Sequence, residues 1–257
     1  MSVVEKGKNV DLLLMVLLCG IIYFCIYRSS KGKVPSFRAL PGLEGIKEAV
    51  LRAVEMRRPV LMTTGMGGFD REGLAGLAVT SHVAKLCAEY EAKLIVPVNK
   101  SEVLPLVESI VQKGYEEAAK PELYKPGQQV QWLSGDQFGY AAGVLGIIER
   151  ERTAAQILVG YFLAEVLLYL EAGKRVGAFQ VGGTAQITNI PFFFVSCDYC
   201  LITEEIFAAG AYLSGEPHQL GSIAGQDIVR ITLVALMVVG FLAAALGSKI
   251  IYDWLGV

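Results

Sequence analysis

The sequence predicts a Rossmann-like, three-layer α/β domain with a mostly parallel sheet of about five strands, placed between two transmembrane helices. Apolar residues make up 53% of the 257-residue chain, whereas roughly 45 to 50% is usual in soluble proteins. Two long uncharged apolar runs lie near the chain ends, and short β-rich runs alternate with helical stretches between them. We expect a membrane anchor with its basic flank over residues 1–34, one soluble domain over residues 35–228 and a second membrane helix over residues 229–257.

The first apolar run, LLLMVLLCGIIYFCIY at residues 12–27, approaches with its flanks the ~20 residues that cross a bilayer. The alternative, a cleaved signal peptide, needs a small-x-small site, but this run stays bulky to its end and is followed by RSSKGK. Lys and Arg are more numerous after the run, from Arg28 to Arg38, than before it, and such flanks tend to remain in the cytoplasm. We therefore expect an inner (plasma) membrane protein with a cytoplasmic domain and both termini outside.

The second apolar run, ITLVALMVVGFLAAALGS at residues 231–248, is free of charge and returns the chain across the membrane. Small residues occur four positions apart in it, which either lets another helix approach closely or reflects the ordinary composition of such helices. These pairs are Gly240 with Ala244 and Ala243 with Gly247.

A third apolar stretch, AAQILVGYFLAEVLLYLEA at residues 154–172, is long enough to span but contains Gln156, Glu165 and Glu171. A carboxylate near the middle of a span costs roughly 2.5 to 3.5 kcal/mol on insertion scales. We expect this stretch to be a buried helix of the soluble domain or a subunit interface, with a third span as the alternative.

The region between the anchors opens with an amphipathic helix at residues 43–57, whose apolar residues recur at helical spacing. Continuous apolar strands separated by helices indicate a parallel sheet, because parallel strands need a crossover connection and bury both faces. The expected strands are residues 59–64, 93–98, 129–134, 176–181 and 191–196. The expected helices are residues 72–91, 101–119, 138–173 and 202–214.

Several stretches resemble an uncharacterised family of prokaryotic membrane proteins that carries a domain of unknown function. They are LPGLEGIKEAVLRAVEMRRPVL, GIIERE, FLAEVLLYLEAG, and CDYCLITEEIFAAGAYLSGEP followed by GSIAGQD, and together they cover nearly all of residues 35–230. The resemblance implies a single membrane-tethered domain and brings no activity with it.

Charge and motifs exclude several classes of protein. A net charge of -2 lacks the basic bias of a nucleic-acid binder. Five scattered cysteines do not form the framework of a small disulfide-stapled domain, so a reducing compartment fits better. Neither a P-loop nor a G-x-S-x-G nucleophile motif occurs. We therefore expect no cofactor, and the motifs leave open whether the protein is an enzyme.

Residues that follow the strands are the candidate ligand-binding residues, because ligands bind at the carboxyl ends of parallel strands. Glycine turns let a backbone approach a ligand, and the N–H groups at a helix start attract anions such as phosphate or carboxylate. The alternative is that the glycines only form turns and that Asp70, Asp136 and Asp198 cap helices. The candidates are Gly67, Gly68, Lys100, Asp136, Gly183 and Thr184.

Cys197 and Cys200 form a C-x-x-C motif that we expect at the end of a strand and before a helix, a placement also used by redox pairs. A structural zinc site would need two further ligands, and His82, His218 and Cys87 are not at ligand spacing. We expect buried or inert thiols and no metal site.

Two functions remain. The leading expectation is a membrane-anchored binding or scaffolding protein that self-associates, with membrane lipid and further copies of the chain as its partners. The alternative is a membrane-tethered enzyme or sensor that binds a small, nucleotide-like anion at the strand ends.

Overall fold

The computed structural model describes residues 9–31 and 41–245. They belong to two compact units, each described by itself below. One unit, Arg38–Ser214, is an α/β domain, and the other is formed by the two ends of the chain, Met1–Phe37 and Gly215–Val257.

The α/β domain contains a six-stranded, wholly parallel sheet, which confirms the predicted fold class with six strands in place of about five. The strand order is β3-β2-β1-β4-β5-β6. The strands are β1 (Val60–Gly65), β2 (Leu94–Val98), β3 (Val130–Trp132), β4 (Ala155–Tyr161), β5 (Phe179–Thr184) and β6 (Tyr199–Ile202).

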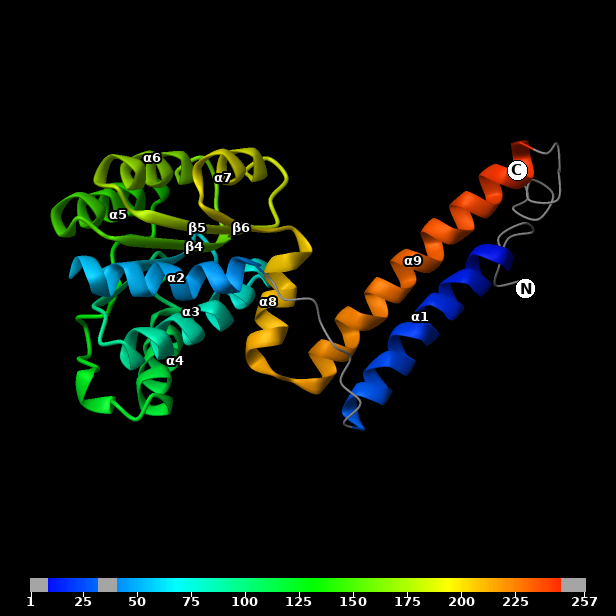
Figure 1. The fold of residues 1–257 in the computed structure, drawn as a ribbon, viewed down its shortest axis with the longest axis horizontal. Coiled ribbons are helices and arrows are strands. Elements are labelled where there is room, and N and C mark those ends of the chain that lie inside the picture. The colour runs from blue at the N-terminus through cyan, green and yellow to red at the C-terminus, as the bar shows by residue number, and fades with distance from the viewer. Residues whose placement is uncertain (1–8, 32–40, 246–257) are drawn as a thin grey trace. The chain divides into compact units, whose positions relative to one another are not determined.

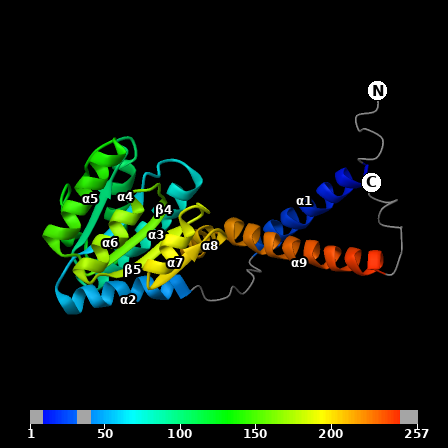
Figure 2. The ribbon, with the colours of Figure 1, turned by 90° about the horizontal axis from the view of Figure 1, so that it is seen from above.

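Helices cover both faces of this sheet and so complete the three layers (Figure 1). One face carries α2 (Pro41–Met56), α3 (Arg71–Glu89), α4 (Leu104–Glu117) and α8 (Glu204–Ser214), with a short 3-10 helix at Pro121–Leu123. The other face carries α5 (Gln137–Glu151), α6 (Val166–Val176) and α7 (Ile190–Ser196), as the view turned by 90° also shows (Figure 2).

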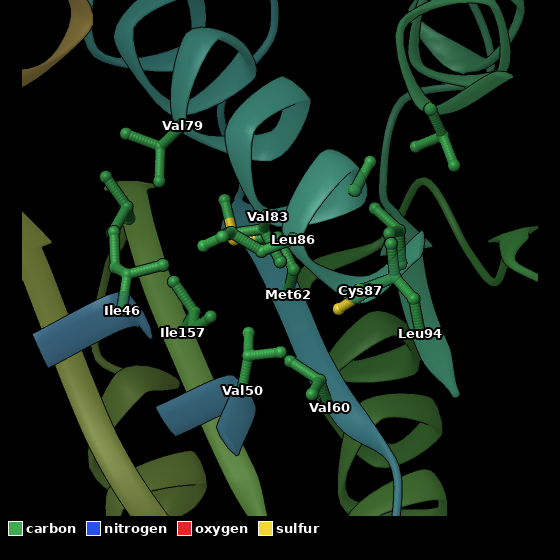
Figure 3. Close-up of a cluster of buried hydrophobic side chains, with 14 of the residues drawn as sticks. Ile46, Val50, Val60, Met62, Val79, Val83, Leu86, Cys87, Leu94 and Ile157 are labelled. Carbon is green, nitrogen blue, oxygen red and sulfur yellow. The ribbon is translucent and has the colours of Figure 1, made fainter. Parts of the chain in front are cut away.

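The core is split by the sheet into two apolar clusters, one under each helical layer. Figure 3 shows the first, in which Ile46 and Val50 of α2 meet Met62 of β1 and Ile157 of β4. These side chains are completely buried. Burying both faces of β1 and β4 requires apolar residues at successive positions, which is why these strands lack the alternation of a half-exposed strand.

The stretch at residues 154–172 is not one helix, and this corrects the predicted helix at residues 138–173. It contains β4, which lies between β1 and β5 at the centre of the sheet, and only afterwards α6. Helix α5 ends at Glu151, and the following residue, Arg152, has a left-handed φ of 49°, without a glycine or proline to signal the break. A short buried strand and a buried helical segment have the same apolar composition, so periodicity alone did not separate them.

The predicted strand at residues 191–196 is also wrong, because these residues form α7. The last strand is β6, immediately downstream. Pro191 lies in the first turn of α7, where its missing N–H has no helical partner in any case. The predicted strand at residues 176–181 begins later, at Phe179, because Gly177 ends α6 in the left-handed conformation.

The helical unit pairs α1 (Asn9–Ser30) with α9 (Pro217–Ala245). Within the described residues these two helices are long and apolar enough to span a membrane, over Leu12–Ser30 and Pro217–Leu242. Helix α9 starts well before the predicted apolar run, because GSIAGQD is helical as well.

Two glycines of α9 allow the close approach of α1. A Cβ at Gly221 would lie 2.7 Å from Ser29 Cβ and 2.8 Å from Ile26 Cα, and one at Gly225 would lie 2.9 Å from Ile22 Cα. The predicted packing of Gly240 with Ala244 and of Ala243 with Gly247 involves side chains or residues outside the described part of the chain. Lys33 and Arg38 of the basic flank also lie outside the described residues.

Candidate functional site

The candidate site lies outside the carboxyl ends of β1 and β4. The chain leaves β1 toward α3 on one face of the sheet and leaves β4 toward α6 on the other. Such a reversal of strand order opens a crevice, and ligands of open α/β sheets bind there. The strand order β3-β2-β1-β4-β5-β6 is also the order of dinucleotide-binding Rossmann domains.

Two loops meet at this end of the sheet, β1–α3 and β4–α6. The N–H of Met66 donates to the carbonyl oxygen of Tyr161 at 2.8 Å. Gly65 ends β1 with a φ of +67°, and a Cβ at this position would collide with the Tyr161 oxygen and the Phe162 ring. A glycine is therefore required here both by the backbone conformation and by the neighbouring loop.

Asp70 fills the position where the N–H groups of the loop and of α3 would otherwise face an anion. Its carboxylate accepts the Gly68 N–H at 2.7 Å and the Gly73 N–H at 2.8 Å, which makes it the N-cap of α3. Burial acts to raise the pKa of Asp70, but these N–H donors and the nearby charge of Lys100 outweigh burial and hold the pKa below its usual value. The helix start therefore already holds one negative charge.

Lys100, from the loop after β2, lies against the glycine turn. A Cβ at Gly68 would be 2.9 Å from its Nζ. Gly67 packs on α3, since a Cβ there would lie 3.1 Å from Gly73 Cα. The structure thus brings three of the predicted site residues, Gly67, Gly68 and Lys100, into one loop cluster.

Thr184 ends β5 and is connected to this cluster through Glu72 in the first turn of α3. Its hydroxyl lies 3.5 Å from Glu72 Oε2, and the side-chain amide of Gln186 donates to Glu72 Oε1 at 2.9 Å. Gly183 lies within β5 rather than after it, where a Cβ would be 3.2 Å from the Val159 side chain. Gly183 is thus part of the buried sheet, not of a loop.

Asp136 has a local role in the structure. It is the N-cap of α5 and accepts the Gly139 N–H at 2.8 Å. The loop before Asp136 contacts the loop after β2, because the side-chain amide of Asn99 donates to the Ser134 carbonyl oxygen at 2.7 Å.

A buried polar cluster on the α5–α6 side of the crevice was missed by the sequence analysis. Glu165 is 3% exposed, and its carboxylate accepts the side-chain amide of Gln137 at 2.8 Å and the Leu163 N–H at 2.9 Å. The Tyr140 hydroxyl bonds to Thr63 Oγ1 at 2.6 Å. The carboxylate of Glu165 in an apolar stretch was the available signal, but the stretch was interpreted as one helix.

Burial raises the pKa of both tyrosines near this carboxylate, Tyr140 and Tyr169, so their hydroxyls stay protonated. The hydroxyl of Tyr169 is buried and has no hydrogen-bond partner among the described residues. Each protonated tyrosine hydroxyl can donate one hydrogen bond and can also accept one.

The charges on the loops at this end of the sheet are mostly negative. The three loops at residues 66–70, 99–103 and 162–165 contain Asp70, Glu102 and Glu165 but a single cationic residue, Lys100. A ligand with one anionic group beside Lys100 fits this charge distribution better than a pyrophosphate does.

The cysteine pair does not lie between the end of a strand and the start of a helix, as the sequence predicted. Cys197 follows α7 and Cys200 lies in β6, so no helix N-terminus stabilises a thiolate there. The hydrogen bond between the two thiols raises the pKa of Cys197 and lowers that of Cys200. The Cys200 thiol also lies 3.3 Å from the Phe193 carbonyl.

No group of three or more metal-ligating side chains occurs among the described residues. A hollow of about 390 Å³ lies by the opposite, amino ends of the strands, next to Lys93, Leu94 and Tyr115. It has no connection with the glycine loops.

One comparison with known proteins identifies a family. The family model described as "Domain of unknown function (DUF6754)" matches residues 1–255. No curated protein and no solved structure matches the chain. The chain therefore belongs to the DUF6754 family.

Proposed function

We propose that this protein is a membrane-anchored scaffold whose α/β domain self-associates at the cytoplasmic face of the inner membrane. The observation that carries the proposal is an exposed apolar surface over α6 and α7, which we call the α6–α7 surface. Its most exposed members are Phe194 and Val195 of α7, 71% and 76% exposed, and the neighbouring helix α6 contributes Leu167 and Leu168, each 43% exposed. Large apolar side chains exposed on neighbouring helices support an interaction site, because extended apolar surface is uncommon on soluble monomers.

The two helices belong to one layer. Lys174 of α6 donates to the carbonyl oxygen of Val195 at 3.3 Å, which joins the end of α7 to α6. A second copy of the chain is the occupant we propose for the α6–α7 surface, since a twofold interface needs only one self-complementary patch.

The orientation rests on the end of α1. The ammonium group of Lys31 lies 4.4 Å from the centre of the Tyr27 ring, and Arg28 is in the last turn. Aromatic and basic residues at one end of an apolar helix support an interfacial position on the cytoplasmic side.

The test is the mass of the full chain in a mild detergent. The proposal expects at least twice the 27.8 kDa chain mass. Phe194→Glu on the α6–α7 surface should shift the protein toward the monomer, whereas Leu106→Glu, at a half-exposed position of α4 on the other face, should not. A monomer at micromolar concentration for the unchanged chain would exclude self-association.

A second candidate is favoured by Lys100 beside Gly68 at the crevice. Here the protein would be a sensor or enzyme for a small anion, nucleotide-like in its single anionic group near Lys100. Inorganic phosphate and nucleoside monophosphates should then raise the unfolding temperature, and Lys100→Ala should remove about 1.5 to 3 kcal/mol of binding free energy, the range for hydrogen bonds to charged groups. If neither ligand raises the unfolding temperature, the anion-binding function is refuted and only the scaffold function remains.

A further inference from the structure

Loops at the carboxyl end of the sheet expose large apolar side chains, which we call the apolar rim. One residue follows each of the strands β1, β4 and β5, one ends β3, and one lies in the first turn of α5. All strands are parallel, so these side chains lie at the same end of the domain. The rim consists of Phe69 (59% exposed), Trp132 (49%), Phe138 (76%), Leu163 (38%) and Ile187 (80%).

Polar neighbours of the rim residues are bonded within the domain. The side-chain amide of Gln137, next to Phe138, donates to the Glu165 carboxylate at 2.8 Å. The same carboxylate accepts the N–H of Leu163 at 2.9 Å. These bonds hold the start of α5 against the loop after β4, so Phe138 and Leu163 belong to neighbouring segments.

The other side of the rim has the same arrangement. The side-chain amide of Gln186, next to Ile187, donates to Glu72 in the first turn of α3 at 2.9 Å. Asp70, next to Phe69, caps the same helix. In each of these pairs the polar side chain is bonded to the protein and the apolar one is exposed, the reverse of what a loop surrounded by water favours.

Helix α2 begins at the end of the sheet that carries the rim. A side chain at Gly42 would collide with Leu201, near the end of β6, whereas one at Gly45 would collide with Tyr199, the first residue of β6. The chain therefore enters the domain at the carboxyl end of the sheet, after the candidate membrane span Leu12–Ser30.

Helix α8 leaves the domain beside the first turns of α3, which start at the same end. A Cβ at Gly210 would lie 3.7 Å from Ala75 Cα, in the second turn of α3. Ser214, where α8 ends, is about 6 Å further along the helix. Two residues then separate α8 from the candidate span Pro217–Leu242.

We propose that the apolar rim inserts into the surface of the bilayer that anchors the chain. The inference rests on the membrane anchoring in the proposed function and is independent of self-association. Aromatic and branched apolar side chains bind the boundary between headgroups and acyl chains through their buried apolar area. A short covalent connection keeps the rim close to this boundary, so its insertion costs little further translational freedom.

The charges among the rim residues indicate the class of lipid. They have both signs, with an excess of carboxylates, so purely anionic headgroups would be repelled. A zwitterionic headgroup, which carries a phosphate and an amine, fits them better. The charged residues are Asp70, Glu102 and Asp136 together with Arg71 and Lys100.

The experiment is the quenching of tryptophan fluorescence by brominated lipid, with the full chain reconstituted into phosphatidylcholine vesicles. Trp132→Phe and Trp254→Phe remove the two native tryptophans, and Phe138→Trp then places one on the rim. Its emission should fall when bromine is carried on the acyl chains near the headgroup. The matched control is Met56→Trp in the same background, since Met56 is 45% exposed at the opposite end of α2.

The emission of the Phe138→Trp protein should fall several times more than that of the control. Ile187→Asp added to this protein should weaken the quenching, because a charge on the rim opposes insertion, whereas added Met56→Asp should not. Both positions are exposed, so neither change disturbs the core.

Equal quenching of the Phe138→Trp and Met56→Trp proteins would overturn the inference. Equal emission of the Phe138→Trp protein in brominated and unbrominated lipid would do the same, and is the result expected if a soluble partner covers the rim. Flotation of the vesicles separates this inference from the proposed function. A chain that floats without quenching refutes only the contact between rim and bilayer, whereas a chain that does not float refutes the membrane anchor as well.

Discussion

Replacing Gly65 by alanine tests the close contact between the loop after β1 and the loop after β4, because a methyl group at this position would collide with Tyr161 and Phe162. A left-handed φ costs an L-residue about 1 to 2 kcal/mol, and forcing a methyl group into a filled space costs about 1 to 3 kcal/mol. The loss of glycine flexibility in the unfolded chain returns about 0.4 to 1 kcal/mol. Gly65→Ala should therefore lower the free energy of unfolding by roughly 1 to 5 kcal/mol, of which about 1 to 3 kcal/mol comes from the collision.

The control is Gly127→Ala, since Gly127 has a similar φ of +74° but a Cβ there would meet nothing within 4 Å. It should lose no more than about 1.6 kcal/mol, from the backbone alone. Thermal unfolding followed by tryptophan fluorescence measures both, and about 2 to 4 °C per kcal/mol is expected for a domain of this size. Equal decreases in Tm for the two variants would show that the contact with Tyr161 carries no energy.

Three further predictions concern topology, the thiols and the cap of α3. A cysteine placed at Gly127 should be protected from an impermeant reagent outside intact cells, while one at Val257 should react; the reverse pattern would mean the opposite orientation. Cys200→Ser should leave expression and assembly nearly unchanged, and a loss of the assembled mass would contradict this. Asp70→Ala should cost about 0.5 to 2 kcal/mol at pH 7. Because the folded pKa of Asp70 is lowered, the difference from the unchanged protein should be complete above the unfolded pKa of about 3.9 and shrink as the pH falls through the folded pKa; a constant difference from pH 7 to pH 2 would exclude this linkage.

The first three strands were predictable because turn and charged residues delimit them. β1, β2 and β3 each lie within the predicted ranges or one residue beyond, and Lys93, Asn99 and Gly135 stand close to their ends. The amphipathic α2 and the apolar α1 were predictable from the residue order as well. In α2 the apolar residues recur on one face of the helix, and in α1 a long run contains no charged residue.

The candidate site could be predicted only in part. That glycines and Asp70 follow β1, and that Lys100 follows β2, can be read from the chain once the strands are placed. That the β1 loop meets the β4 loop, and so brings in Glu165, depends on β4 pairing with β1, a long-range hydrogen-bonding choice with no local signal. The carboxylate of Asp70 at the start of α3 is likewise a matter of side-chain geometry.

By itself, the sequence determined the fold class, the two apolar helices and the loops that could carry a site, because these follow from local hydrophobic pattern and turn chemistry. The tertiary structure decided that residues 155–161 are a strand and residues 190–196 a helix, since burial between neighbours outweighs the weak preference of a short apolar run. It also decided the height of α9 against α1. Gly221 and Gly225 acquire their meaning only when a second helix lies against them, because a side chain at either position would collide with α1.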